Sequence, residues 1–200
     1  MGLQTSVKIA ALFVQPDGCY KDLEGIDLWD EARDARKYNG PYPVVAHPPC
    51  QLWGNLAFVN YKRWGGEHNR PGNDDGCFES ALESVRKWGG VLEHPAGSRA
   101  FFKYLHTKPS QAQWQKLMCG GWVCEVWQSA YGHKANKSTW LYYYGSSMPP
   151  SMRLDRPVGT HQIGHCAKGN NKPVLQGKAA SATPIEFRDA LIDMAVVSAN

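Results

Sequence analysis

The sequence has no long apolar run, no paired-cysteine zinc motif and no internal repeat. A membrane-spanning helix needs about 20 consecutive apolar residues, and no stretch of this 200-residue chain approaches that length. The N-terminal apolar stretch lacks a basic region and a cleavage site, and Asp17 interrupts it early, so we expect no signal peptide. These absences predict a cytoplasmic protein that does not interact with membranes.

Metal-ligand patterns are also sparse. The chain has no Cys-x-x-Cys pair and no His-x-Glu motif, which a catalytic zinc site of the deaminase type requires. A small structural zinc site stays open as an alternative, because Cys119, Cys124, His161 and His165 have spacings similar to those of metal ligands. We otherwise expect no metal. The six cysteines follow no regular spacing, which favours reduced thiols over disulfides.

The composition is that of an ordinary globular protein, with 42% hydrophobic and 20% charged residues. A chain of this length suits a single domain over residues 1–200. The net charge of +4 permits binding to a phosphate backbone without demanding it.

Apolar strand-like runs alternate with helical periodicity along the chain, which predicts an α/β fold with a single Rossmann-like, largely parallel sheet flanked by helices. Strands are expected over residues 8–14, 44–46, 91–95, 122–129 and 139–144, and residues 25–30 form either a strand or the start of a helix. Helices are expected over 77–88, 110–118 and 185–197, the last capped by Thr183. A loop-rich segment spans 149–180, before the C-terminal helix within 184–197.

The run from Pro43 to Gly54 carries the first chemical signal. A short buried strand ends at Ala46, and His47-Pro48-Pro49-Cys50 follows as a stiff, extended turn. Ligands of open α/β sheets bind beyond the carboxyl ends of strands. Cys50 is therefore a candidate nucleophile, and a buried structural cysteine is the alternative.

A carboxylate, Glu93, ends another predicted strand. A thiolate adds to carbon 6 of a pyrimidine when an acidic group hydrogen-bonds the ring at nitrogen 3, and the adduct makes carbon 5 nucleophilic. Cys50 and Glu93 on neighbouring strand ends would supply both groups.

The order of these motifs resembles the catalytic core of the cytosine-5 DNA methyltransferase family, over about Ile9 to Gly145. His-Pro-Pro-Cys-Gln is similar to the family's nucleophile loop, Glu93 falls at its ring-binding glutamate, and Trp127 to Gly145 is similar to its later strand pair. The resemblance implies a catalytic pair of Cys50 and Glu93, with substrate contacts from Pro48, Pro49, Gln51, His94, Gln128, Tyr131 and Lys137.

The resemblance also implies S-adenosylmethionine as the cofactor, held near Phe13 and by Asp27 or Asp30. The family's glycine-rich loop is replaced by Val14-Gln15-Pro16-Asp17, which lacks the glycines that allow close backbone approach. We therefore expect weak or absent binding of this cofactor. No segment is long enough for a target-recognition domain, a small size that by analogy suits a phage or mobile-element protein in a bacterial cytoplasm.

Two functions remain open. The first is covalent modification of a pyrimidine in single-stranded DNA, in a flipped base or in a free nucleotide. The second is a binding module for a nucleotide or flipped base that performs no transfer. In both, the basic segment Arg153 to Lys178, which includes Lys168 and Lys172, is expected at the surface, either in contact with phosphates or as a solvated loop. The oligomeric state stays undetermined.

Overall fold

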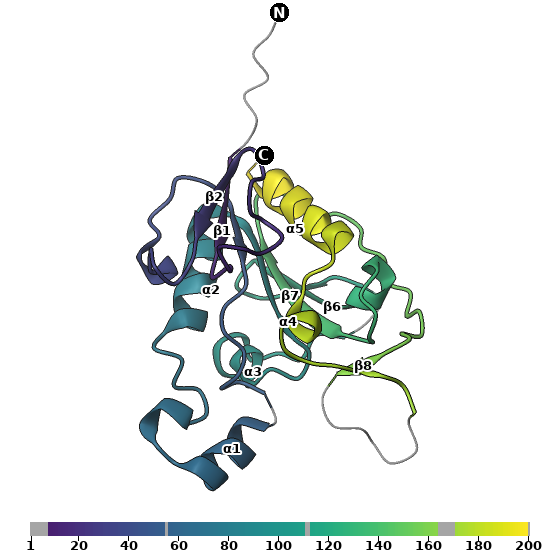
Figure 1. Cartoon of the computed structure of the whole chain (residues 1–200). Coiled ribbons are helices and arrows are strands. Elements are labelled where there is room, and N and C mark those ends of the chain that lie inside the picture. The colour runs from purple at the N-terminus through teal and green to yellow at the C-terminus, as the bar shows by residue number, and fades with distance from the viewer. Residues whose placement is uncertain (1–7, 55, 111–112, 164–170, 200) are drawn as a thin grey trace, which may run out of the picture.

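The computed structural model describes residues 8–54, 56–110, 113–163 and 171–199. Within these ranges the chain is an α/β protein with a seven-stranded mixed sheet and helices packed alongside (Figure 1). The strands of this sheet are β1 (Ile9–Leu12), β2 (Ile26–Trp29), β3 (Val44–Ala46), β4 (Gly90–Pro95), β5 (Gln115–Lys116), β6 (Trp122–Trp127) and β7 (Ser138–Tyr144).

The helices are α1 (Leu56–Trp64), α2 (Cys77–Trp88), α3 (Arg99–Leu105), α4 (Gly177–Ser181) and α5 (Ile185–Ser198). Short 3-10 helices cover Ala35–Lys37, Glu67–Asn69 and Gln128–Tyr131. A separate parallel pair is formed by β8 (Gln162–Ile163) and β9 (Val174–Leu175). Among the residues described here, none of these helices is long and apolar enough to cross a membrane.

The sheet has the strand order β2-β1-β3-β4-β7-β6-β5. The four strands from β2 to β4 run parallel, and β7, β6 and β5 join by antiparallel pairing. The predicted α/β class is thus confirmed, while the expected largely parallel sheet is found only in the N-terminal half. The reason lies in the connections, because the short link between β6 and β7 allows only an antiparallel return.

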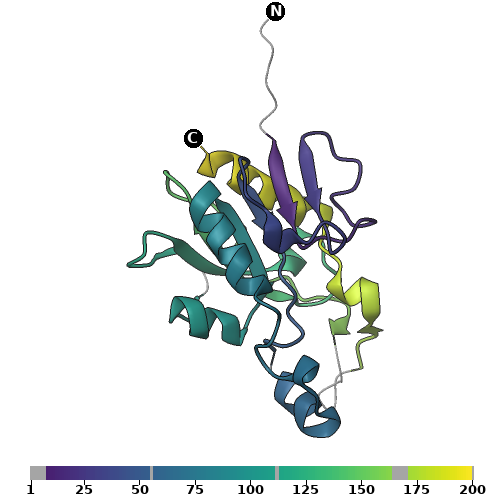
Figure 2. The same ribbon diagram turned by 90° about the vertical axis from the view of Figure 1, so that its left-hand side faces the viewer.

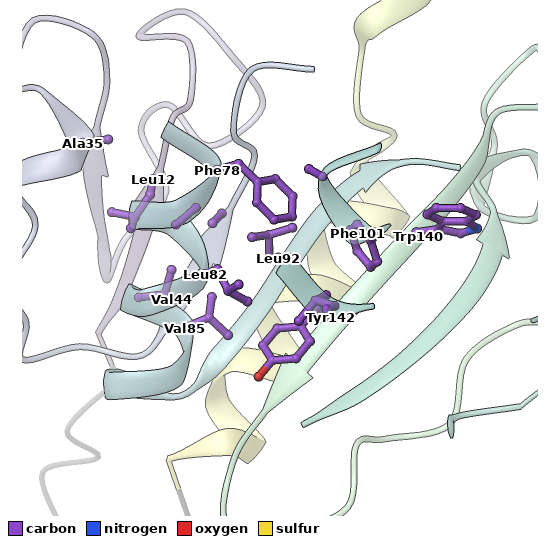
Figure 3. Packing of buried hydrophobic residues seen from close by; sticks show 14 of the residues in the cluster. Leu12, Ala35, Val44, Phe78, Leu82, Val85, Leu92, Phe101, Trp140 and Tyr142 are labelled. Carbon is purple, nitrogen blue, oxygen red and sulfur yellow. The ribbon is translucent and has the colours of Figure 1, made fainter. Parts of the chain in front are cut away.

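Hydrophobic cores cover both faces of the sheet, as the alternation of side chains along each strand requires. On one face, Val44 and Leu92 pack with Phe78 and Leu82 of α2 and with Phe101 of α3 (Figure 3). On the other face, residues of α5 pack against the alternate strand positions, among them Ile9, Val45, Val91, Leu141, Phe187 and Leu191. Figure 2 shows α2 and α5 on opposite sides of the strands.

One predicted helix is wrong. Residues 110–118 contain the edge strand β5, whose Gln115 and Lys116 pair with Val123 and Trp122 of β6. The backbone N–H of Ser110, expected as a helix cap, donates to the Gln115 side chain, and the Gln115 amide donates back to the Ser110 hydroxyl. Pairing with β6 therefore overrides the helical pattern of this segment.

Other elements follow the predictions with local differences. The helix at 77–88 is α2, and α5 begins one residue beyond Pro184, which takes the capping position expected for Thr183. The segment 149–180, expected as loop, contains β8, β9 and the start of α4. Helices α1 and α3 were not expected from the sequence. Ser98 caps the N-terminus of α3, and its hydroxyl accepts a hydrogen bond from the Ala100 N–H.

Candidate active site

A large cleft lies where the parallel half of the sheet reverses its strand order. From β1 the chain moves to β2 on one side, and it then returns to β3 on the other side of β1. Such a switch point leaves a crevice at the carboxyl ends of the strands, where ligands of α/β proteins bind. The cleft has a volume of about 1060 Å³ and is lined by Phe13, Asp30, Cys50, Glu93 and Lys137, among others.

The Cys50 turn is anchored on both sides. The His47 N–H donates to the Leu12 carbonyl at 3.0 Å, which continues the β1–β3 pairing. After the two prolines, the Trp53 N–H donates to the Cys50 carbonyl at 3.0 Å. Trp53 is buried, and its indole N–H donates to Asp74 Oδ2 at 2.8 Å. The half-buried thiol is thus presented by a turn with little freedom to move.

Glu93 is buried, with both carboxylate oxygens engaged. Its Oε2 lies 3.0 Å from Nδ1 of His47, and its Oε1 accepts a hydrogen bond from Gln128 Nε2 at 3.1 Å. Gln128 Nε2 also donates to Thr139 Oγ1 at 2.9 Å. Burial alone would raise the pKa of Glu93, but the hydrogen bond and charge of His47, with a smaller effect of Lys137, lower it to about 2. Glu93 is therefore an anion at neutral pH.

His47 and Tyr20 are two site residues that the sequence analysis did not assign. His47 Nε2 lies 2.9 Å from the Tyr20 hydroxyl, on the far side of the ring from Glu93. Because an ionised Glu93 only accepts, His47 Nδ1 donates to it, and the ring lies between the Glu93 carboxylate and the Tyr20 hydroxyl. The alternation of side chains along the strands could have indicated His47. Val45 pairs with Val91, so His47 and Glu93, each two residues further on, lie side by side on the same face of the sheet.

Groups in the cleft shift the pKa of the Cys50 thiol in opposite directions. Burial raises its pKa, and the negative charge of Glu93 raises it further, while the Lys137 ammonium lowers it. Lys137 is held in place by the carbonyls of Ser181 and Ala182, to which Nζ donates at 3.1 and 3.3 Å. Formation of a thiolate at Cys50 therefore depends on positively charged groups in the cleft, such as the Lys137 ammonium.

The structure brings most of the predicted substrate residues together. Pro48, Pro49, Gln51 and Lys137 line the cleft with Cys50. Gln128 lies behind Glu93 and orients it rather than lining the cleft. Tyr131 is placed elsewhere, packed on the Phe187 ring with its hydroxyl bonded to the Arg153 N–H.

His94 points to the opposite face of β4 from Glu93. It is fully buried, with its ring 5.2 Å from the Phe78 ring, and it does not line the cleft. Burial lowers the pKa of His94 to about 4, although the charge of Glu93 opposes this shift. Within the described residues, neither ring nitrogen makes a hydrogen bond of ordinary geometry, although the backbone of Pro49 and Pro48 lies close enough to oppose the lowering of the pKa. His94 thus supports the Cys50 turn from below and stays neutral.

The predicted cofactor residues separate into two groups. Phe13 and Asp30 line the cleft, at the ends of β1 and β2 respectively. In nucleotide-binding α/β folds, an acidic residue at the end of the second strand binds a ribose, and Asp30 has this place. Asp27 instead accepts hydrogen bonds from Trp29 and Arg33. Phe13 has a left-handed backbone with φ of 58°, so the turn after β1 is strained at the cleft.

The turn after β1 offers little to the backbone-bound end of S-adenosylmethionine. Pro16 has no backbone N–H to offer, and the carboxylate of Asp17 stands at the cleft wall, paired with Lys178 Nζ at 2.7 Å. Asp30 lines the cleft at the end of β2, where its Oδ1 accepts a hydrogen bond from the Arg33 N–H at 3.0 Å.

No metal cluster appears in the part of the chain that the structure describes: no group of three or more His, Cys, Asp or Glu is arranged to hold an ion. His165 and Lys168 lie outside the described residues, so the structural zinc alternative and part of the basic segment are untested. Within that segment, Arg153 pairs with Glu186 at 2.8 Å and Lys172 Nζ donates to the Gly159 carbonyl.

Comparisons of this chain with protein-family models, with curated proteins and with solved structures give no match.

Proposed function

We propose that this protein modifies a pyrimidine base by covalent catalysis, with Cys50 as nucleophile and Glu93 as the carboxylate that binds the ring. The observation that carries the proposal is that both side chains line one cleft, from the ends of the neighbouring parallel strands β3 and β4. The proposal also draws on the resemblance to cytosine-5 methyltransferases in the order of the sequence motifs.

In the proposed reaction, the Cys50 thiolate adds to carbon 6 of cytosine and forms a C–S bond. The electron pair of the carbon 5–carbon 6 double bond moves toward nitrogen 3, which takes a proton from solvent. An anionic Glu93 accepts hydrogen bonds from the 4-amino group and from the protonated nitrogen 3, and its charge favours that protonation. Carbon 5 then attacks an electrophile and loses its own proton to solvent; the thiolate is expelled from carbon 6 and nitrogen 3 gives its proton back to solvent, which restores the ring.

The electrophile can be a solvent proton or an electrophilic one-carbon donor. A donor of the sulfonium class would leave a methyl group on carbon 5 and depart with the electron pair of its own carbon–sulfur bond. The residues of the cleft, in this proposal, bind and orient the pyrimidine whichever electrophile is used, because adduct formation at carbon 6 comes first.

The test is exchange of the carbon 5 hydrogen of deoxycytidine in an oligonucleotide or in dCMP, followed in deuterated water by mass spectrometry. Exchange needs the carbon 6 adduct and no donor. We expect exchange in the native protein, none in Cys50→Ser, and unchanged exchange in Cys19→Ser, a second cysteine of the same cleft. An active Cys50→Ser variant would exclude Cys50 as the nucleophile.

A binding module is the second candidate, and the Cys50 environment favours it. Burial and the Glu93 charge raise the pKa of the thiol, which keeps it protonated in the free protein. Under this alternative, the cleft binds dCMP or a cytosine-containing oligonucleotide with no exchange at carbon 5. Binding without exchange in the native protein would therefore select the binding module over the enzyme.

A further inference from the structure

Helix α1 exposes an unusual number of large apolar side chains. Of its nine residues only Ala57 is buried, whereas Leu56, Phe58, Val59, Tyr61 and Trp64 are all exposed, Trp64 by 68%. Figures 1 and 2 show α1 projecting from one end of the molecule, away from the sheet. Exposed apolar clusters of this kind mark interaction sites in soluble proteins.

Cations are interleaved with these rings. The Arg63 guanidinium lies 4.9 Å from the centre of the Trp64 ring, and Arg99 from α3 lies 3.8 Å from the centre of the Phe58 ring. α1 contains Lys62 and Arg63 in its last turn and has no acidic residue. Aromatic rings can stack on bases, and neighbouring cations can contact phosphates. This surface is therefore complementary to single-stranded nucleic acid, which carries both groups.

A smaller pocket lies between the cleft and the 3-10 helix Glu67–Asn69, which neighbours α1. α1 begins six residues after Cys50. This pocket, of about 410 Å³, shares Pro49, Gln51, Asp75 and Cys77 with the cleft and reaches His68, and its lining also includes Asp74. His68 belongs to the 3-10 helix that packs against α1. A strand with one base in the cleft would pass this pocket on its way to α1, with its phosphates turned away from Asp74 and Asp75.

We propose that α1 is a base-stacking platform for single-stranded DNA on the strand that carries the target pyrimidine. This proposal rests on the function proposed above, because that function makes the ligand a DNA strand that carries the target base. Bases next to the target stack on Trp64 and Phe58, while Lys62 and Arg63 contact phosphates. A second copy of this chain and an unrelated protein surface are the other occupants that the experiment must exclude.

The experiment measures binding of a fluorescein-labelled oligothymidylate of about 12 nucleotides by anisotropy, at several salt concentrations. We expect Trp64→Ala to weaken binding at least about fivefold, because stacking on one aromatic ring contributes about 1–3 kcal/mol per base. The matched control is Met148→Ala, which removes an equally exposed apolar side chain outside α1 and should not change affinity.

The charges are tested separately. The double variant Lys62→Gln/Arg63→Gln should lower the slope of log affinity against log salt by about 1.4, the value for two lost phosphate contacts. The double variant Lys108→Gln/Lys116→Gln, near the β5 edge of the sheet, is the control and should leave the slope unchanged. Native-like affinity and slope in both α1 variants would overturn the proposal, as would tighter binding of oligouridylate than of oligothymidylate.

Two further measurements separate this proposal from its alternatives and from the proposed function. A native dimer in sedimentation that becomes a monomer in Trp64→Ala would assign α1 to self-association and overturn the proposal. Carbon 5 exchange on free dCMP should be the same in Trp64→Ala as in the native protein. If the native protein shows no exchange on any substrate but α1 variants still lose oligothymidylate affinity, the platform stands and the enzymatic function fails.

Discussion

His47 Nδ1 lies 3.0 Å from Glu93 Oε2, across the neighbouring ends of β3 and β4. This contact, together with Gln128 on the other carboxylate oxygen, holds Glu93 as a buried anion in the wall of the cleft. A buried carboxylate without such partners would take up a proton instead. The pair thus links the stability of the fold to the chemistry that we propose for the cleft.

Glu93 should make the protein less stable in acid. Its pKa in the folded protein is lowered from 4.5 to about 2, so it stabilises the fold above about pH 4.5, and this stabilisation is lost as the pH falls toward 2. The shift corresponds to about 3 kcal/mol at most. In urea unfolding, Glu93→Gln should be less stable than the native protein at about pH 6 and should approach it at about pH 3. Parallel stability curves for the two proteins would contradict a lowered pKa.

His94 should act in a higher pH window. Burial lowers its pKa from 6.5 to about 4, so the unfolded chain binds a proton that the folded protein excludes, and stability falls as the pH drops from about 6.5 to 4. His94→Leu removes this titration and keeps an apolar contact with Phe78. We expect the variant to be more stable than the native protein at about pH 4.5 by about 2–3 kcal/mol, with a smaller difference at about pH 7. Equal loss of stability in both proteins over this range would show that His94 is not the titrating group.

Gly90 should be essential for the alignment of β3 with β4. Its φ is 122°, and a Cβ added there would lie 1.9 Å from the Val44 carbonyl oxygen in the neighbouring strand. Gly97 also has a positive φ, of 83°, but a Cβ there would meet nothing within 4 Å. Gly97→Ala should therefore cost only the backbone strain of about 1–2 kcal/mol, and Gly90→Ala should cost clearly more in the free energy of unfolding. Equal costs would mean that the sheet relaxes around the added methyl group.

Asp17 should limit binding of S-adenosylmethionine. The carboxylate stands at the cleft wall after β1, and Pro16 beside it has no backbone N–H for the cofactor. Calorimetry should detect weak or no binding by the native protein and tighter binding by Asp17→Gly. Asp22→Gly, which removes a carboxylate outside the cleft lining, is the control. Micromolar affinity in the native protein, unchanged in Asp17→Gly, would show that the cleft holds this cofactor without the family's glycine-rich loop.

Local patterns in the sequence were sufficient for several elements. The helical spacing of Phe78, Leu82 and Val85 predicted α2 to the residue, because one face of this helix must cover the sheet. The apolar run ending at Ala46 and the two prolines after it predicted where the chain leaves the sheet. The same reasoning placed Cys50 in the turn after β3 and Glu93 on β4, while their roles as nucleophile and ring-binding carboxylate stay predictions.

Only the tertiary structure decided what those residues meet. The register of β3 against β4 places His47 beside Glu93, 46 residues away in the sequence. The antiparallel pairing of β6 and β7 brings Gln128, 35 residues from Glu93, behind the same carboxylate. Pairing with β6 turned the predicted helix at 110–118 into the edge strand β5, because strand pairing with a distant segment outweighs weak local propensity. The exposure of α1 was likewise invisible in its sequence, since its apolar residues would suit a buried helix equally well. The sequence determined the groups available for chemistry, and long-range packing decided which of them share a cleft.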